Sequence, residues 1–363
     1  MRIVIDCRSI HSYMGGIGQL SLHLANALNR IDHHHSFTAL VSDAVDGLEM
    51  PFFVVGAGMI DPSFEQFRLP QILKDLKTDL YLNTCFSVPL LKTSKYQMSI
   101  IHDVVFEDRP EWVEPKLRDY LSHWSRIAAT FADRIITVSD YSKGRISKVY
   151  GIEPDRIIRI YNGVAPPPRL SEEFIEHVRK KYTLEKSFVL YIGTIERKKG
   201  LPELINAVAH LSGSDFNDTL VFAGARGGGE WEIEQELAQK KLLSRSKLLG
   251  HVPELEKWAL LKLCSVLIYP SKYEGFGLTP LEAMSIGTPC ITNNTTSLPE
   301  IVGSAAIKVD VTQVKAFSEA ILRALRNQDV RRVASEMGPT QARHFTWEKS
   351  AAQYIAQFEA VVS

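Results

Sequence analysis

The chain is long enough for two domains, and it carries no excess of either charge. Its 363 residues exceed the usual size of one domain and give each of two halves enough residues for its own hydrophobic core. Lys plus Arg and Asp plus Glu each count 42, so no overall basic field would attract nucleic acid, and we expect no nucleic-acid partner.

The cysteines and the first residues indicate a reducing compartment. Four cysteines lie singly, without the spacing of a zinc site, and their apolar surroundings predict buried, free thiols. The start, MRIVIDCRSI, lacks the longer apolar run and the cleavage site of a signal peptide, and no run approaches the length of a membrane span. We therefore expect a cytoplasmic protein, and a peripheral contact with the inner face of the membrane stays open.

Short apolar runs alternate with helical patterns along almost the whole chain. In the first half they are RIVID (2–6), FTALV (37–41), FFVV (52–55), DLYLN (79–83), SIIHDV (99–104), RIITVS (134–139) and IIRIYNGV (157–164). In the second half they are FVLYIGT (188–194), TLVFAGA (219–225), KLLGHV (247–252), SVLIYPS (265–271), PCITNN (289–294) and AIKVD (306–310). Continuous apolar strands separated by helices indicate parallel sheets that are covered on both faces.

The sequence APPPR at 165–169 marks the predicted domain boundary, because three consecutive prolines continue neither a helix nor a central strand. We predict two doubly wound domains, over residues 1–165 and 166–345. The last pattern, over 346–363, predicts a helix with an apolar stripe at Trp347, Ala351, Tyr354, Ile355 and Phe358. Open parallel sheets bind ligands beyond the carboxyl ends of their strands, so we expect the chemistry in strand-end loops that face each other across a cleft.

The first loop that could hold a phosphate is YMGGIGQLSLHLANAL, where glycines 15, 16 and 18 precede a helical pattern. Glycine before a helix lets backbone N–H groups approach an anion. A dinucleotide-binding fingerprint fits poorly, because eight residues separate Asp6 from Gly15 and Ser21 replaces the third glycine. An anion site and an ordinary helix-entry loop stay equally open on these residues.

The second such loop is YIGTIERKKGL (191–201), where Arg197, Lys198 and Lys199 lie together at the start of a helical pattern. Three cations at a helix N-terminus oppose the helix dipole and cost stability unless an anion is bound. That conflict favours a binding function over a solvated charge run, and a diphosphate is the ligand that we expect.

The third loop is KYEGFG (272–277), which leads into the helical pattern LTPLEAMSIG. Thr279 is the predicted N-cap and Glu282 falls three positions later, which forms a capping box and gives Glu282 a structural role. Glu274 has no such role, and a loop carboxylate beside two glycines is expected to meet hydroxyls, a cation or water. Backbone N–H groups at Gly277 and Leu278 would face the same space. A sugar that carries a phosphate would satisfy both the carboxylates and the N–H groups.

Glu274 and Glu282 are separated by seven residues, and this pattern resembles the E-x7-E signature of retaining family 4 glycosyltransferases with the GT-B fold. The resemblance covers essentially the whole chain, and its motifs together are highly specific. They are GGIG (15–18), SIIHDVVFEDRPE (99–111), VSDYSKGRI (138–146), YNGV (161–164), YIGTIERKKGL (191–201), GHVP (250–253), SLPEIVG (297–303) and FTWEKSAAQY (345–354). The resemblance implies two Rossmann-like domains, with the C-terminal helix crossing back to the first.

The resemblance also implies roles for matching residues. Glu274 would contact hydroxyls of the donor sugar, and Glu282 would contact the ribose of its nucleotide. Lys199 matches the phosphate-binding lysine of the family, and either Arg197 or Lys198 would be its partner.

Further contacts follow from the same resemblance. His102 would lie over the reacting carbon, although without the family it would be taken for a hydrogen-bonded histidine at a strand end. Val252 would meet the nucleobase through its backbone. The donor's sugar and diphosphate would meet the backbone of Gly275, Phe276, Gly277 and Leu278, and the glycines Gly15 and Gly16 of the first domain.

The implied reaction is a metal-independent, retaining transfer of a hexosyl group from a nucleotide-diphospho-sugar, which is a substrate and not a cofactor. The motifs are most similar to those of bacterial enzymes that build surface polysaccharides and lipopolysaccharide, many of them mannosyltransferases. GDP-mannose is favoured over UDP- or dTDP-sugars, and the acceptor is a saccharide or a lipid-linked saccharide. A nucleotide-sugar epimerase of the same fold is the first alternative, which the E-x7-E spacing disfavours. The second is a nucleotide-sugar-binding regulatory protein without turnover, which the intact Glu274, Lys199 and His102 disfavour.

Overall fold

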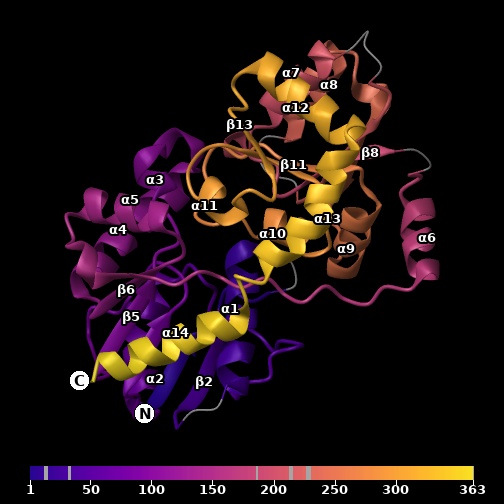
Figure 1. Ribbon diagram of the computed structural model, residues 1–363. Helices are drawn as coiled ribbons and strands as arrows, with labels where there is room; N and C mark the ends of the chain where they lie inside the picture. Colours follow the sequence, from indigo (N-terminus) through magenta and orange to yellow (C-terminus); the bar gives the residue numbers. More distant parts are fainter. Residues whose placement is uncertain (12–14, 32–33, 185–186, 212–215, 226–229, 363) are drawn as a thin grey trace. The chain divides into compact units, whose positions relative to one another are not determined.

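The computed structural model describes residues 1–11, 15–31, 34–184, 187–211, 216–225 and 230–362, and for residues 197 and 230–232 it describes the backbone alone. The chain divides into two compact units (Figure 1). The first unit comprises residues 1–163 together with 345–363, and the second comprises residues 164–344. Each unit contains its own parallel sheet.

The first unit is built on a parallel sheet with the strand order β3-β2-β1-β4-β5-β6-β7. Its strands are β1 (Arg2–Asp6), β2 (Ser36–Val41), β3 (Phe52–Val54), β4 (Leu80–Asn83), β5 (Tyr96–Ile100), β6 (Arg134–Thr137) and β7 (Ile157–Arg159). The chain adds β2 and β3 on one side of β1 and then β4 on the other. The strand order therefore reverses between β1 and β4.

Helices connect these strands and bury the apolar faces of the sheet. They are α1 (Gly16–Arg30), the π-helix η1 (Phe64–Arg68), α2 (Leu69–Asp75), α3 (Val105–Asp108), α4 (Pro115–Phe131), α5 (Asp140–Tyr150) and α14 (Trp347–Ala360), with 3-10 turns η2 (Pro110–Trp112) and η3 (Pro154–Arg156). Beneath η1 and α2, Val4 of β1 and Tyr81 of β4 share a core with Phe64 and Leu69. This core fixes η1 close to the carboxyl ends of the central strands.

The second unit has the strand order β10-β9-β8-β11-β12-β13, again with parallel pairs. Its strands are β8 (Phe188–Ile192), β9 (Thr219–Ala223), β10 (Ser246–Gly250), β11 (Val266–Tyr269), β12 (Cys290–Asn293) and β13 (Ile307–Val309). Its helices are α6 (Glu172–Lys181), η4 (Arg197–Lys199), α7 (Leu201–His210), α8 (Glu230–Gln239), η5 (Leu243–Arg245), α9 (Glu254–Leu263), α10 (Leu278–Ser285), α11 (Leu298–Val302), α12 (Val314–Arg326) and α13 (Gln328–Ala342). Here the order reverses between β8 and β11.

Alternate residues of the second sheet enter two separate cores. Tyr191 and Phe222 pack with residues of α7, α8 and α12 on one face. Leu190 and Val221, the preceding residue in each strand, pack with residues of α6, α9 and α10 on the other. Because side chains alternate along a strand, burial of both faces explains why these strands are continuously apolar.

The C-terminal helix α14 belongs to the first unit. Its Ser350 hydroxyl donates to the carbonyl of Tyr161 at 2.5 Å, and a Cβ at Gly163 would lie 2.2 Å from the backbone nitrogen of Trp347. Glycine at 163 thus lets the start of α14 lie directly on the segment after β7. In the predicted apolar stripe Ile355 is half-buried, and the buried members are Trp347, Ala351, Tyr354 and Phe358.

The predicted fold class, two doubly wound parallel-sheet α/β domains, is confirmed. One strand is displaced from its prediction: β5 ends at Ile100, before His102, because its neighbour β4 ends at Asn83, opposite Ser99. The cysteines are free as predicted, but Cys85 is only half-buried. Among the described residues, no helix combines the length and the apolar character needed to cross a membrane.

Candidate functional site

The point of strand reversal in the second sheet carries two of the predicted residues. The turn η4 follows β8 and ends at Lys199, and the loop after β11 carries Glu274. Doubly wound sheets bind ligands at such switch points, because the loops there diverge and leave the carboxyl ends of two strands accessible. This pair lies at the centre of the candidate site.

Backbone contacts hold η4 against the end of β11. The N–H of Lys272 donates to the carbonyl of Lys198 at 2.6 Å. Gly200, which follows η4, has a φ of 67°, and a Cβ at this position would lie 2.1 Å from the carbonyl oxygen of Pro270. Only glycine fits this close approach, which brings the side chain of Lys199 to the loop after β11.

Lys199 and Glu274 form a largely buried ion pair. Lys199 Nζ lies 2.6 Å from Glu274 Oε1, the hydroxyl of Tyr269 donates to the same oxygen at 2.9 Å, and the two charged side chains are 11% and 14% exposed. Burial lowers the pKa of the Lys199 ammonium, but the Glu274 carboxylate outweighs burial and raises that pKa above its usual range. Burial likewise raises the pKa of Glu274, and Lys199 followed by Lys198 outweighs it and lowers that pKa. Both groups are therefore charged at neutral pH.

The loop that carries Glu274 is fixed by the segment after β12. The hydroxyl of Ser297, the residue before α11, donates to the carbonyls of Glu274 at 3.0 Å and Phe276 at 2.8 Å. The N–H of Glu274 donates to the hydroxyl of Thr296 at 3.3 Å. Phe276 is buried, and Gly275 and Gly277 flank it. Together with the contact between Lys272 and Lys198, these bonds hold the loop against the segments that follow β8 and β12.

The predicted capping box is wrong. The helix α10 begins at Leu278 with Gly277 as its N-cap, at a φ of 124°, so Thr279 and Pro280 lie inside the first turn. Glycine accepts this positive φ, and the chain therefore enters the helix two residues earlier than a threonine cap would allow. The N-cap residue is a glycine and so offers no side chain to cap this first turn. Its N–H groups and the positive end of the helix dipole are consequently uncovered by a cap, and Glu282 has no capping role.

Glu282 has instead a partner that the sequence did not indicate. Lys257 Nζ, from α9, lies 2.6 Å from Glu282 Oε1 and 2.8 Å from Glu254 Oε1. Burial raises the pKa of the Glu282 carboxyl, Lys257 offsets part of this rise, and the charge of Glu254 adds to it. Burial lowers the pKa of Lys257, but the two glutamates outweigh it and raise that pKa.

The basic residues of η4 were expected to be neutralised by a bound anion, but two of them are paired with carboxylates of the chain. Lys198 Nζ lies 3.5 Å from Glu196 Oε2, and Lys199 is paired with Glu274, so carboxylates of the chain itself meet the charges for which an anion was expected. The side chain of Arg197 lies outside the described residues. The choice between Arg197 and Lys198 as the partner of Lys199 thus stays a prediction.

Two other predicted donor contacts lie at strand and helix ends. Val252 follows β10 and is buried in the core beneath α9. In the first unit α1 begins at Gly16, with Gly15 as its N-cap, so Gly16 and Gly18 lie within the first turn and not before the helix. A Cβ at Gly15 or Gly16 would meet no atom of the described residues within 4 Å.

His102 lies just beyond the end of β5 and is buried. Its Nε2 is 2.8 Å from the carbonyl oxygen of Thr84, and because a carbonyl only accepts, Nε2 carries the proton and Nδ1 carries the lone pair. The ring of Phe86 lies edge-on to the imidazole, with 5.2 Å between the two ring centroids. Phe86 itself has a φ of 63°. Burial lowers the pKa of His102, so the imidazole is neutral at neutral pH.

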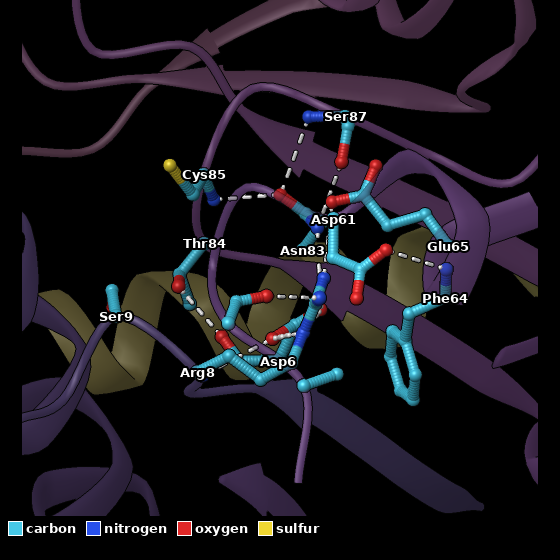
Figure 2. Close-up of polar contacts among 12 residues, drawn as sticks. Asp6, Arg8, Ser9, Asp61, Phe64, Glu65, Asn83, Thr84, Cys85 and Ser87 are labelled. Carbon is cyan, nitrogen blue, oxygen red and sulfur yellow. Dashed lines mark hydrogen bonds and ion pairs between the residues drawn. The ribbon is translucent and has the colours of Figure 1, made fainter. Parts of the chain in front are cut away.

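A buried charged network occupies the switch point of the first sheet, between β1 and β4 (Figure 2). Arg8 donates to the Asp6 carboxylate from Nε at 3.0 Å and from Nη2 at 2.8 Å, and Nη2 lies 3.1 Å from Glu65 Oε1 on η1. The hydroxyl of Tyr81 also donates to Asp6 at 2.7 Å. An Asp-x-Arg sequence directly after an apolar strand was the signal that could have revealed this network.

The same network fixes the turn that holds His102. Asn83 Oδ1 accepts hydrogen bonds from the N–H groups of Cys85 at 2.6 Å and Ser87 at 3.3 Å, as Figure 2 shows. The hydroxyl of Thr84 donates to the backbone carbonyl of Asp6 at 2.6 Å. Since the carbonyl of Thr84 accepts from His102, the end of β1 and the imidazole are linked through one residue.

Models of two glycosyltransferase families match the chain. Residues 14–166 match "Glycosyltransferase Family 4", and residues 173–341 match "Glycosyl transferases group 1". The O-antigen chain mannosyltransferase B of Escherichia coli is 31% identical over 294 residues, which cover 79% of this chain and 76% of that protein. The chain is a family 4 glycosyltransferase.

Other relatives of this glycosyltransferase are longer proteins or share only its fold. The serotype-specific mannosyltransferase WbdA of Escherichia coli is 30% identical over 62% of this chain, which spans 29% of that protein. A glycosyltransferase of Rickettsia africae superposes with a TM-score of 0.77 at 15% identity, over 100% of this chain and 98% of its own. WaaG, a glycosyltransferase of lipopolysaccharide biosynthesis, superposes with a TM-score of 0.72 at 16% identity, over 96% and 98%. These likenesses place the glycosyltransferase in the GT-B fold.

Proposed function

We propose that this glycosyltransferase moves a mannosyl group from GDP-mannose to a saccharide or a lipid-linked saccharide in the synthesis of a bacterial surface polysaccharide, with retention at the anomeric carbon. The observation that carries the proposal is the Lys199–Glu274 pair at the switch point of the second sheet. A buried cation and a buried carboxylate beside an uncapped helix N-terminus offer one group for a diphosphate and one for sugar hydroxyls.

The proposed donor site uses groups that are already in place. Lys199, with Lys198 or Arg197, and the first N–H groups of α10 would stabilise the diphosphate as it leaves. Glu274 would accept from hydroxyls of the sugar, and Glu282 would accept from hydroxyls of the ribose. Because each of these carboxylates is held at only one oxygen by its lysine, the other oxygen can serve a ligand.

The proposed reaction proceeds by attack from the same face of the sugar. The bond between the anomeric carbon and the diphosphate oxygen breaks, and the acceptor oxygen forms the new bond. The acceptor's proton passes to the departing diphosphate. His102 would contact the reacting sugar as a neutral imidazole, with Nδ1 accepting a hydroxyl hydrogen bond, because Nε2 is engaged by Thr84.

Relatives support mannose among the hexoses. The names of both the E. coli O-antigen chain mannosyltransferase B and WbdA describe mannosyl transfer, and the former is similar along most of both chains. A nucleotide-sugar substrate is supported further by the structurally similar HepE of Anabaena, whose structure was determined in complex with UDP and glucose.

The test begins with the thermal shift of the protein in GDP, UDP, ADP and dTDP, because a ligand at a hundred times its Kd stabilises the native state by about 2.7 kcal/mol. We expect GDP to raise the melting temperature most. GDP-mannose with a mannosylated acceptor should then give a product whose anomeric configuration, read by NMR, is that of the donor. A larger shift with another diphosphate would overturn the choice of donor, and an inverted product would overturn retention.

A further inference from the structure

Each glutamate of the E-x7-E motif is held by a lysine from a different element. Lys199 of η4 bonds Glu274 Oε1 at 2.6 Å, and Lys257 of α9 bonds Glu282 Oε1 at 2.6 Å. Lys199 belongs to the predicted phosphate site, but Lys257 lies in a helix that contributes no predicted residue. The repeated arrangement indicates that Lys257 pairs with and orients the carboxylate of Glu282, as Lys199 does for that of Glu274.

Lys257 is itself held in place. Its side chain is 13% exposed, and its ammonium lies 2.8 Å from Glu254 Oε1, one turn earlier in α9. That same oxygen of Glu254 accepts from the indole N–H of Trp258 at 2.9 Å, and Trp258 is buried. A residue of the same helix, Glu254, therefore holds the ammonium, which also contacts Glu282 of α10.

A purely structural role for this pair explains less than a role in binding. Two apolar side chains of similar volume would join α9 to α10 as well or better, because desolvation of two charges offsets most of their attraction. The bond from Lys257 also engages one oxygen of Glu282, so the carboxylate is held in one orientation while its second oxygen can accept from a ligand. These features suit a carboxylate that must stay ionised in a partly buried place.

We propose that Lys257 is a positioning residue for donor binding, which holds the Glu282 carboxylate in the charged form and the orientation that accept hydrogen bonds from the ribose 2′- and 3′-hydroxyls. This inference rests on the proposed function, in which Glu282 contacts the ribose. It adds a residue of α9 to the donor site, and it assigns to that residue a selectivity for ribose over its deoxy forms.

The test compares two ligands that differ only in these hydroxyls, GDP and 2′,3′-dideoxy-GDP, by calorimetry on the full chain. The wild-type protein should prefer GDP by about ten- to hundredfold, the value of one or two hydrogen bonds to a charged group. In Lys257→Met the preference should fall to about twofold or less, and Lys257→Arg should restore most of it. The ratio of GDP to guanosine affinity, which reports on the phosphate contacts, should stay within about twofold of wild type.

Lys181→Met is the matched control. Lys181 of α6 lies 2.7 Å from Glu256, so this variant removes a lysine–glutamate pair from α9 that does not involve the motif. It should leave the preference for GDP over its dideoxy form unchanged. If Lys257→Met does not fold, Lys257→Gln, which keeps a hydrogen-bond donor without its charge, is expected to fold and to lose most of the preference.

The outcomes separate the two proposals. A wild-type protein that binds GDP and dideoxy-GDP equally would overturn both the proposed ribose contact of Glu282 and the inference about Lys257, whereas a wild-type protein that does not bind GDP would overturn the proposed donor. A wild-type preference that survives intact in Lys257→Met or Lys257→Gln would overturn the inference about Lys257 alone. A similar loss of preference in Lys181→Met would also overturn it, because the effect would then report a general loosening of α9.

Discussion

Among single residues, Lys199 and Glu274 contribute contacts to the fold and also lie at the centre of the proposed donor site. The pair is charged in a place from which water is largely excluded, with 11% and 14% of the side chains exposed. A loop carboxylate without a structural role was expected at Glu274, whereas the structure gives it a bond to Lys199, a bond from Tyr269 and two backbone bonds to the segment after β12. Glu274 is therefore expected to affect stability as well as turnover.

Removal of one partner of the Lys199–Glu274 pair should lower the free energy of unfolding more than removal of both. Glu274→Leu or Lys199→Met alone leaves a buried charge without its counter-ion and should lower the free energy of unfolding by about 3–5 kcal/mol. The double variant should recover most of that loss and remain inactive, because it restores a neutral interior without restoring the proposed diphosphate site. Denaturant unfolding and a transfer assay measure the two effects. A double variant as unstable as the sum of the single variants would show that the pair contributes through other contacts.

At the scale of elements, the short turn η4 depends on a close approach between two segments of backbone. Residues 198–200 lie against residues 270–272, and the N–H of Lys272 donates to the carbonyl of Lys198 at 2.6 Å. Gly200 allows this approach through its positive φ and its lack of a side chain. The turn is too short to be stable alone, so its position follows from these contacts and from the anchoring of α7 in the core.

Gly200→Ala should therefore destabilise the fold and weaken the proposed donor site. The φ of 67° costs an alanine about 1–2 kcal/mol, and the contact of Cβ with the carbonyl of Pro270 adds a displacement of η4. Gly151→Ala is the matched control, because Gly151 has a φ of 65° and open space around the new Cβ. We expect Gly151→Ala to lose only the stability that the positive φ costs an alanine. It should bind GDP normally in calorimetry. Equal losses of stability and unchanged GDP binding in both variants would show that the close approach at Gly200 does not position Lys199.

At the scale of the whole molecule, the chain is two units with separate cores. The second unit, residues 164–344, is continuous in sequence and contains Lys199, Glu274 and Glu282 of the proposed donor site. The first unit is discontinuous, because α14 returns to it and buries Trp347, Tyr354 and Phe358. Its stability thus requires the last residues of the chain, whereas that of the second unit does not.

A fragment that spans residues 164–344 should fold and bind GDP. Its two cores are complete without α14, and Lys199, Glu274 and Glu282 all lie within it. Circular dichroism measures folding, and calorimetry measures the affinity, which we expect within about tenfold of that of the full chain because the first unit contributes only part of the proposed contacts. A folded fragment that shows no binding would place the nucleotide elsewhere.

The parallel sheets and the family could be predicted from local features of the sequence. Continuous apolar runs arise from burial of both faces of a sheet, and this burial leaves a local signal in every strand, such as 188–192 and 219–223. The spacing of Glu274 and Glu282 and the basic residues after β8 are likewise local features. They pointed to the loops that the structure brings to the switch point of the second sheet.

Which charges pair with each other depends on contacts between residues that are distant in sequence. The pairs Lys199–Glu274 and Lys257–Glu282 join residues that are 75 and 25 positions apart, and no local pattern encodes such partners. The start of α10 was also misplaced, because Thr279 and Glu282 satisfy a local capping rule, whereas the helix begins after Gly277, where a Cβ would lie only 2.9 Å from Leu298 Cδ2. Local propensity fixes an element to within a turn, but contacts distant in sequence fix its first residue and the partner of each buried charge, since burial makes an unpaired charge costly.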